Sequence, residues 1–437
     1  MELLLVSAYV IVFLIIIRFS SFYKIPGISF YFIGGLFLLK VLAGVAMYFI
    51  YLKYYKTTES ADIFNYFKDS NVLFSAVYDN PGDYLRMLTG WESDSPHLYK
   101  YYEQMNFWVK NHNYDLYNDN RTIIRFNALI QLFSFQYFNV HTVFMSFISF
   151  TGLIYIYKAC IQFFKNKKNE LLIVIFLLPS VIFWSSGVLK EGLVFLGLGL
   201  FIYSTFNFIQ TYQFKFIPGL LLAILILMLS KFYVLFAMLP GVITFFMVRR
   251  FPRINMWLSL AIVHILLVTL LFNTKYFSSY DLPQILSQKQ HDFVNFINSV
   301  DSVGSKIDLP LIEPSTIGII KNVPNALYNV IIRPTPGDIS SIIMWPAFFE
   351  NIFILLLIIV AIIFPVKKPE KEIFPFLMFC ISFSLILFTL IGMTTPVLGA
   401  IVRYKIPAFP FFVMIILLFI NKEKIIHLLP FKPKSHE

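Results

Sequence analysis

The stretch ELLLVSAYVIVFLIIIR at residues 2–18 decides how the rest of the chain is interpreted. An apolar run lies between the acidic Glu2 and the basic Arg18. A membrane span needs about 20 apolar residues, or somewhat fewer where flanking side chains anchor it. A signal peptide carries its positive charge before the apolar run, whereas here that charge follows it. The stretch therefore predicts a first span whose N-terminus lies outside the cytoplasm.

The composition of the whole chain is typical of a many-pass membrane protein. Hydrophobic residues make up 58% of the 437 residues and charged residues only 14%, and the mean hydropathy is +0.74. Soluble domains rarely have such values. The net charge of +11 is spread between the apolar runs, so we expect no nucleic-acid partner. Cys160 and Cys380 lie in or beside apolar runs, where packing is expected rather than a disulfide.

Apolar runs recur along the chain and predict an all-α polytopic protein. We expect about eleven spans, near 3–18, 28–51, 140–163, 170–187, 192–209, 216–230, 232–248, 255–272, 346–365, 373–393 and 406–421. The chain then divides into 1–51 (two spans), 52–139 (an outer loop with amphipathic helices), 140–272 (central spans), 273–345 (a second outer loop) and 346–437 (the last spans and a cytoplasmic tail). An odd number of spans places the C-terminus in the cytoplasm.

Positive charge supports the same orientation. Lysine and arginine cluster in alternate gaps between the apolar runs, at 18–24, 165–168, 249–253, 367–371 and 422–434. Short basic loops stay in the cytoplasm, whereas long loops can be translocated. In the long segments 52–125 and 273–345, acidic residues balance or outnumber basic ones. We therefore expect both segments, and the chemistry of the protein, on the outer face.

Two carboxylates in the first outer segment are candidate catalytic residues. Asp62 follows the second expected span closely and is a candidate general base for a sugar hydroxyl. Asp69 is a candidate second carboxylate. An ordinary capping role for Asp62, at the start of the helix that follows, is the alternative.

Ionisable residues at three outer tips are candidate ligands for the phosphate of a lipid carrier. Lys190 and Glu191 form one pair, and Lys231 is expected in a cavity or re-entrant turn between two short spans. Arg403 and Lys405 precede the last span, and Arg333 lies in the second outer segment. We expect Lys190, Lys231 and Arg403 to share one outward-opening cavity.

Each of these residues also has a structural interpretation. Lys190 and Glu191 would neutralise each other, Arg403 and Lys405 would extend to the lipid headgroups, and Arg333 would belong to a proline-fixed turn. The histidines have no zinc-site spacing, so we expect no zinc centre. The chain also lacks a Walker A loop and a GxSxG elbow, which weakens ATP-driven transport and serine hydrolysis as functions.

Four stretches resemble motifs of membrane glycosyltransferases of the GT-C class and of bacterial envelope-polysaccharide proteins. They are SADIFNYFKDS (60–70), PSVIFWSSGVLKEG (179–192), NVPNALYNVIIRPTPGD (322–338) with FFEN (348–351), and GAIVRYKIPAFPFF (399–412). The acidic motif of that class follows its first span, whereas here it follows the second. The resemblance implies Asp62 as the base and Lys190 and Arg403 as phosphate contacts.

The resemblance implies a glycosyltransferase on the outer face of a bacterial cytoplasmic membrane, active in envelope polysaccharide or glycoconjugate synthesis. Its donor would be a polyprenyl-phosphate-linked sugar, and its acceptor would be a glycan or glycolipid. Membrane lipid would surround the protein. Dependence on a divalent metal stays open. The alternatives are an O-antigen or capsule-type polymerase or ligase, a transporter or flippase for lipid-linked intermediates, and a non-catalytic assembly factor.

Overall fold

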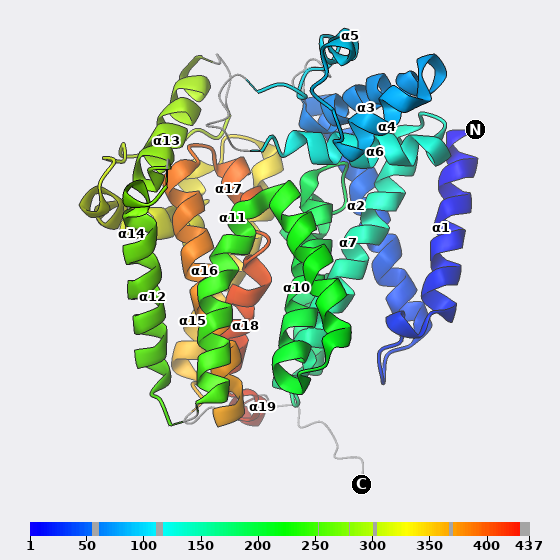
Figure 1. The fold of residues 1–437 in the computed structure, drawn as a ribbon. Coiled ribbons are helices and arrows are strands. Elements are labelled where there is room, and N and C mark those ends of the chain that lie inside the picture. Colours follow the sequence, from blue (N-terminus) through cyan, green and yellow to red (C-terminus); the bar gives the residue numbers. More distant parts are fainter. Residues whose placement is uncertain are drawn as a thin grey trace. The chain divides into compact units, whose positions relative to one another are not determined.

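The computed structural model describes residues 1–54, 61–110, 117–251, 253–278, 280–299, 304–366 and 370–428. Four of the lysines behind the expected orientation lie outside these residues: Lys367, Lys368, Lys432 and Lys434. Throughout the described ranges the chain folds into helices, and β-structure is limited to two isolated bridges (Figure 1). The expected all-α class is confirmed.

The helices belong to two compact units. The first unit comprises residues 1–160 and 181–235, and the second comprises 161–180 and 236–437. The first contains α1 (Glu2–Phe19), α2 (Phe30–Tyr54), α3 (Asp62–Asp79), α4 (Pro81–Thr89), α5 (Tyr99–Tyr102), α6 (Asn120–Ser134), α7 (Phe138–Cys160) and α10 (Lys190–Thr211). The second contains α8 (Lys168–Phe176), α12 (Met256–Phe272), α13 (Leu282–Ser299), α14 (Thr316–Ile331), α15 (Trp345–Ile363), α16 (Phe374–Thr394), α17 (Leu398–Tyr404), α18 (Phe409–Phe419) and α19 (Lys422–Leu428). Both α9 (Pro179–Trp184) and α11 (Ile217–Arg250) contribute residues to each unit.

Seven of the described helices are long and apolar enough to cross a membrane, or up to eight if the bent pair α17 and α18 forms one span. The expected count of about eleven is not reached, for physical reasons. The run 170–187 divides into the short helices α8 and α9, and α12 has only 17 residues. The expected spans 216–230 and 232–248 both lie in α11, which leaves helical geometry at Lys231 (φ −151°, ψ 80°).

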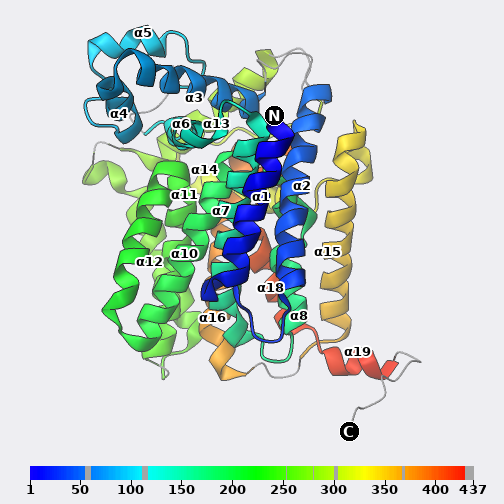
Figure 2. The same cartoon turned by 90° about the vertical axis from the view of Figure 1, so that its right-hand side faces the viewer.

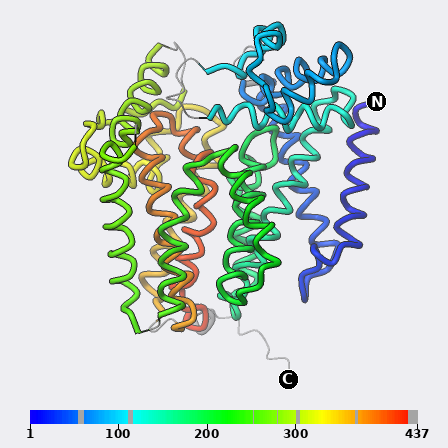
Figure 3. The backbone as a smooth tube through the Cα atoms, viewed as in Figure 1, coloured from blue at the N-terminus to red at the C-terminus, as the bar shows by residue number. Residues whose placement is uncertain are grey.

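The first unit is built on close contact between α7 and α10. A Cβ atom at Gly152 of α7 would overlap the carbonyl oxygen of Phe195, and one at Gly199 of α10 would overlap that of Gly152. Small residues let membrane helices approach backbone to backbone in this way. The helices α1 and α2 pack on α7, as the backbone trace shows (Figure 3).

The polar segment of the first unit also folds into helices, as expected. The helices α3, α4 and α6 pack together, and they lie at the end of α1 that carries Met1 (Figures 1 and 2). In α6 the N-cap residue is Asp119 and the first helical residue is Asn120. Because α1 runs from Glu2 to Phe19, its basic last turn at Arg18 lies at the end of the helix opposite to Met1.

The second unit places its own polar segment around α16. Both α13 and α14 pack against α16, and a Cβ atom at Gly392 of α16 would overlap the carbonyl oxygen of Ala326 in α14. The described part of 273–345 therefore contains α13, α14 and several 3-10 helices. Cys160 and Cys380 are both buried and free, as expected.

Candidate functional site

A non-helical turn carries the Lys190–Glu191 pair into the interior of the first unit. The turn follows α9, and α10 begins with Lys190. Lys40 of α2 donates from Nζ to Ser185 Oγ in this turn over 2.6 Å, and both residues are buried. A Cβ atom at Gly44 would lie 2.6 Å from the Ser186 carbonyl oxygen, so α2 also contacts the turn through its backbone. These contacts fix the start of α10.

Lys190 is held by polar groups at the start of α6. Its Nζ donates to Asp119 Oδ2 over 2.5 Å and to Asn120 Oδ1 over 2.9 Å. The Tyr66 hydroxyl of α3 donates to the same Asn120 oxygen over 3.1 Å. The Lys190 side chain is only 9% exposed. Its ammonium group is therefore enclosed and stabilised by one carboxylate and one amide oxygen.

Glu191 has its ion-pair partner on a different helix. Lys231 donates from Nζ to Glu191 Oε1 over 2.8 Å, and the two side chains are 3% and 0% exposed. Lys231 is the residue at which α11 leaves helical geometry. Two residues earlier, the Leu229 carbonyl accepts from Thr122 Oγ1 over 2.6 Å. Lys231 therefore lies at a break within one long helix, and its placement in a cavity or re-entrant turn stays a prediction. The pair with Glu191 supplies the charge compensation that burial requires.

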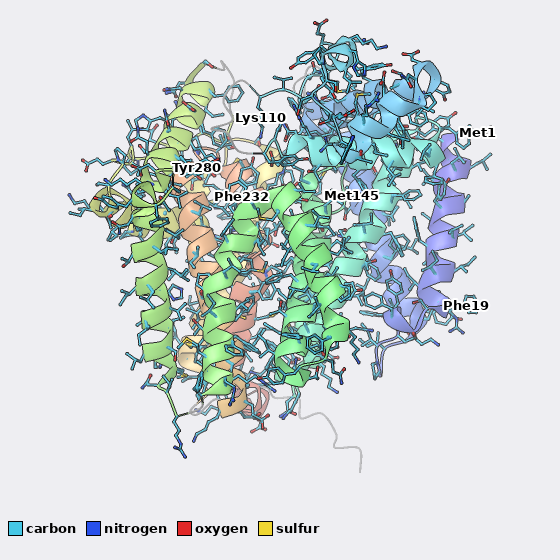
Figure 4. The ribbon with its side chains drawn as sticks, in the orientation of Figure 1. Met1, Phe19, Lys110, Met145, Phe232 and Tyr280 are labelled. Carbon is cyan, nitrogen blue, oxygen red and sulfur yellow. The ribbon has the colours of Figure 1, made fainter. Side chains whose placement is uncertain are left out.

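The ammonium groups of Lys190 and Lys231 lie in the same region of the first unit. Lys231 lies close enough to Lys190 for their positive charges to repel each other. Asp119 relieves part of this repulsion and also accepts from Lys110 Nζ at Oδ1 over 2.8 Å. Burial raises the pKa of Asp119, but the nearby charges of Lys190 and Lys110 outweigh it and hold that pKa well below its ordinary value. Figure 4 labels Lys110, which lies toward the Met1 end of this unit and not toward the Phe19 end.

Asp69 binds the backbone of residues 106–107 through both oxygens of its carboxylate. Its Oδ1 accepts from the Asn106 amide over 2.9 Å and its Oδ2 from the Phe107 amide over 2.8 Å. The side chain is fully buried, and burial raises the pKa of Asp69 while the two backbone hydrogen bonds oppose that rise. With both oxygens engaged, this carboxylate positions residues 106–107.

Asp62 is the first residue of α3 and follows the N-cap residue Ala61, whose side chain accepts no hydrogen bond. The Asn65 amide donates to the Ala61 carbonyl over 3.1 Å. A carboxylate in the first turn of a helix is favoured by the helix dipole. Asp62 is half-buried, and its role as a base stays a prediction.

Three further candidates belong to the second unit. Lys405 donates from Nζ to the Val330 carbonyl over 3.1 Å, and it acts electrostatically on Glu350. Arg333 lies 3.6 Å from Asp338 Oδ2 through its Nε, and its guanidinium lies over the Tyr328 ring. Arg403 is buried in α17, with its guanidinium 5.7 Å from the centroid of the Tyr404 ring. The shared cavity for Lys190, Lys231 and Arg403 stays a prediction.

Sequence reasoning missed Asp119, which joins Lys190 to Lys110. Its only signal was its position before the stretch NRTIIRFNALIQLFS at 120–134, because the partners lie nine and 71 residues away. It also missed the bond between Lys40 and Ser185, although Lys40 stands out as a charge inside an apolar run. Glu350, which accepts from the Ser180 amide over 3.0 Å, was noticed only as part of the FFEN stretch.

Across the part of the chain that the structure describes, no three His, Cys, Asp or Glu side chains gather as metal ligands. The described groups that do converge are ammonium groups and their paired carboxylates, an arrangement suited to exchanging one anion for another. No family model, curated protein or solved structure matches this chain.

Proposed function

We propose that the protein is a membrane glycosyltransferase that uses a polyprenyl-phosphate-linked sugar as donor and a glycan or glycolipid as acceptor. The observation that carries the proposal is the pair of neighbouring buried ammonium groups of Lys190 and Lys231. A cation near hydrocarbon is expensive, and such residues generally have a function. Phosphate oxygens are suitable ligands for these groups because ionised partners form short, strong hydrogen bonds.

The proposed orientation places this site on the outer face of a bacterial cytoplasmic membrane. Arg18 lies in the last turn of α1, at the Phe19 end, and Lys24 follows soon after in the sequence. The polar helices α3, α4 and α6 lie at the Met1 end (Figure 2). Basic residues favour the cytoplasmic side, which supports an outer location for Met1, Lys110 and the polar helices.

In the proposed reaction, Asp62 accepts the proton of the acceptor hydroxyl as that oxygen attacks the anomeric carbon of the sugar. The bond from the anomeric carbon to the phosphate oxygen breaks, and its electron pair leaves with the phosphate. Lys190 and Lys231 stabilise the charge that develops on the leaving group. Asp69 keeps a supporting role, and Arg403 of the second unit is kept as a candidate phosphate-binding residue.

The test compares two variants in a strain from which the gene has been deleted. Asp62→Ser removes the carboxylate and keeps a side chain suited to a helix start, and Lys190→Met removes one ammonium group. We expect Asp62→Ser to reduce formation of the extended lipid-linked glycan about 10²–10⁴-fold, the usual effect of losing a general base. We expect Lys190→Met to reduce it as well. The measurement is mass spectrometry of lipid-linked and polymeric glycans.

Lys100→Met is the matched control, because Lys100 is an exposed lysine of the same polar segment. It should restore the glycan profile fully. Full activity of a normally folded Asp62→Ser variant would remove Asp62 from the mechanism and favour a polymerase or ligase. A deletion strain that builds the complete lipid-linked glycan but retains it on the inner leaflet would favour a transporter.

A further inference from the structure

Asp119 is shared between one exposed and one enclosed lysine. Its Oδ1 accepts from Lys110 over 2.8 Å and its Oδ2 accepts from Lys190 over 2.5 Å. Exposure falls along this chain of charges, from 38% for the Lys110 side chain to 26% for Asp119 and 9% for Lys190. Asp119 therefore lies between a lysine at the surface and an enclosed one.

The Asp119 carboxylate binds these two lysines and does not cap α6, although it lies at the N-cap position. Asp119 is the N-cap residue of α6, a position at which aspartate commonly accepts from the helix amides, yet its side chain makes no capping bond. The neighbouring Asn118 accepts from the Asn120 amide through Oδ1 over 3.2 Å. Because the Asp119 side chain makes no capping bond, its carboxylate can move without breaking one.

We propose that Asp119 is an internal anion that occupies Lys190 until the phosphate of a ligand replaces it. The inference rests on the proposed function in one respect, that Lys190 binds phosphate. A phosphate oxygen takes the place of Asp119 Oδ2 beside Lys190 Nζ, while Lys110 retains Oδ1. No covalent bond changes in this exchange. A dianionic phosphate monoester, such as the lipid phosphate that remains when the sugar leaves, competes better than a singly charged phosphodiester, so the exchange favours monoester ligands.

The experiment measures binding of farnesyl phosphate to the full-length protein in detergent micelles, by calorimetry. Farnesol tests the phosphate requirement, and inorganic phosphate distinguishes a free anion from a lipid headgroup. Lys190→Met should abolish the binding. Asp119→Asn removes the competing charge and should tighten the binding about tenfold, which corresponds to about 1.4 kcal/mol of competition. Asp119→Ser removes the same charge and supplies a preferred capping residue. It provides the same test if Asp119→Asn fails to fold.

Asp94→Asn is the matched control, because it removes an exposed carboxylate that pairs with Arg121 in the same unit. It should leave the affinity unchanged. If Lys190→Met binds farnesyl phosphate like the wild type, the proposed phosphate site is wrong and the exchange fails with it. If Lys190→Met abolishes binding but both Asp119 variants bind no tighter than the wild type, the phosphate site stands and the exchange alone is wrong. Tightening by Asp94→Asn as well would overturn the specific role of Asp119.

Discussion

In the first unit, Lys190 and Glu191 are each paired with a residue of another element and not with each other. Lys190 and Glu191 are adjacent in sequence, but each has its ion-pair partner on another element, Asp119 and Lys231 respectively. Adjacent residues on a helix point in different directions, so they do not face each other. Compensation of each buried charge therefore depends on tertiary contacts.

Lys231→Met should destabilise the protein strongly. The change removes the Lys231 ammonium group from the buried Glu191 carboxylate, and breaking a buried pair typically costs about 3–5 kcal/mol of unfolding free energy. The double variant Lys231→Met with Glu191→Gln removes both charges and should recover most of that loss. The thermal unfolding midpoint in detergent measures both effects.

Lys165→Met serves as the comparison, because Lys165 forms an exposed pair with Glu372. Exposed pairs contribute little to stability, so the unfolding midpoint should not move. A double variant as unstable as Lys231→Met alone would show that the packing of Lys231, and not its charge pair, stabilises the break in α11.

At the scale of elements, close helix contact and one helix break position the site. The glycines of α7 and α10 allow their backbones to meet, which fixes the helix that begins with Lys190. The break in α11 places Lys231 beside Glu191 near the start of α10. Neither feature contributes a reacting group, yet both determine where the two ammonium groups lie.

Gly152→Ala should separate α7 from α10, because its methyl group would overlap the Phe195 carbonyl. Overpacking of this kind typically costs about 1–3 kcal/mol, and we expect a lower unfolding midpoint. Gly35→Ala in α2 is the control, since a Cβ atom there meets nothing within 4 Å. An equal loss at both positions would mean that general helix effects, and not the contact between α7 and α10, explain the result.

At the scale of the whole molecule, the distribution of basic residues along the chain predicts how the protein is oriented in the membrane. Basic clusters in alternate gaps predict an outer N-terminus and outer locations for 52–125 and 273–345. The helices α3, α13 and α14 within those two segments are not among the described helices suited to cross a membrane. This agrees with segments that lie outside the bilayer.

Cysteine labelling of intact cells tests this orientation. An impermeant maleimide should modify cysteines introduced at Glu103 and Asp308, which are exposed in the two polar segments, and should not modify one at Asn166. The wild-type protein provides the background, because Cys160 and Cys380 are buried. Labelling at Asn166, without labelling at the other two positions, would reverse the orientation and move the proposed reaction to the cytoplasmic side.

The sequence by itself determined the fold class, the apolar helices and the residues at which charge had to be compensated. Apolar runs define membrane helices because the bilayer accepts no unsatisfied backbone groups. The same reasoning identified Lys190, Glu191 and Lys231, since ionisable residues beside apolar runs are conspicuous. It also predicted an unusual position for Lys231, in a cavity or re-entrant turn, because each flanking run was short.

Only the tertiary structure decided which groups meet. Asp119 joins Lys190 from 71 residues away, and Lys231 joins Glu191 across 40 residues. Such pairs depend on how helices pack, which no local pattern encodes. The structure also reduced eleven apolar runs to seven or eight helices suited to spanning. Hydropathy records how apolar a segment is, whereas its continuity as a helix depends on backbone breaks and on the contacts that stabilise them.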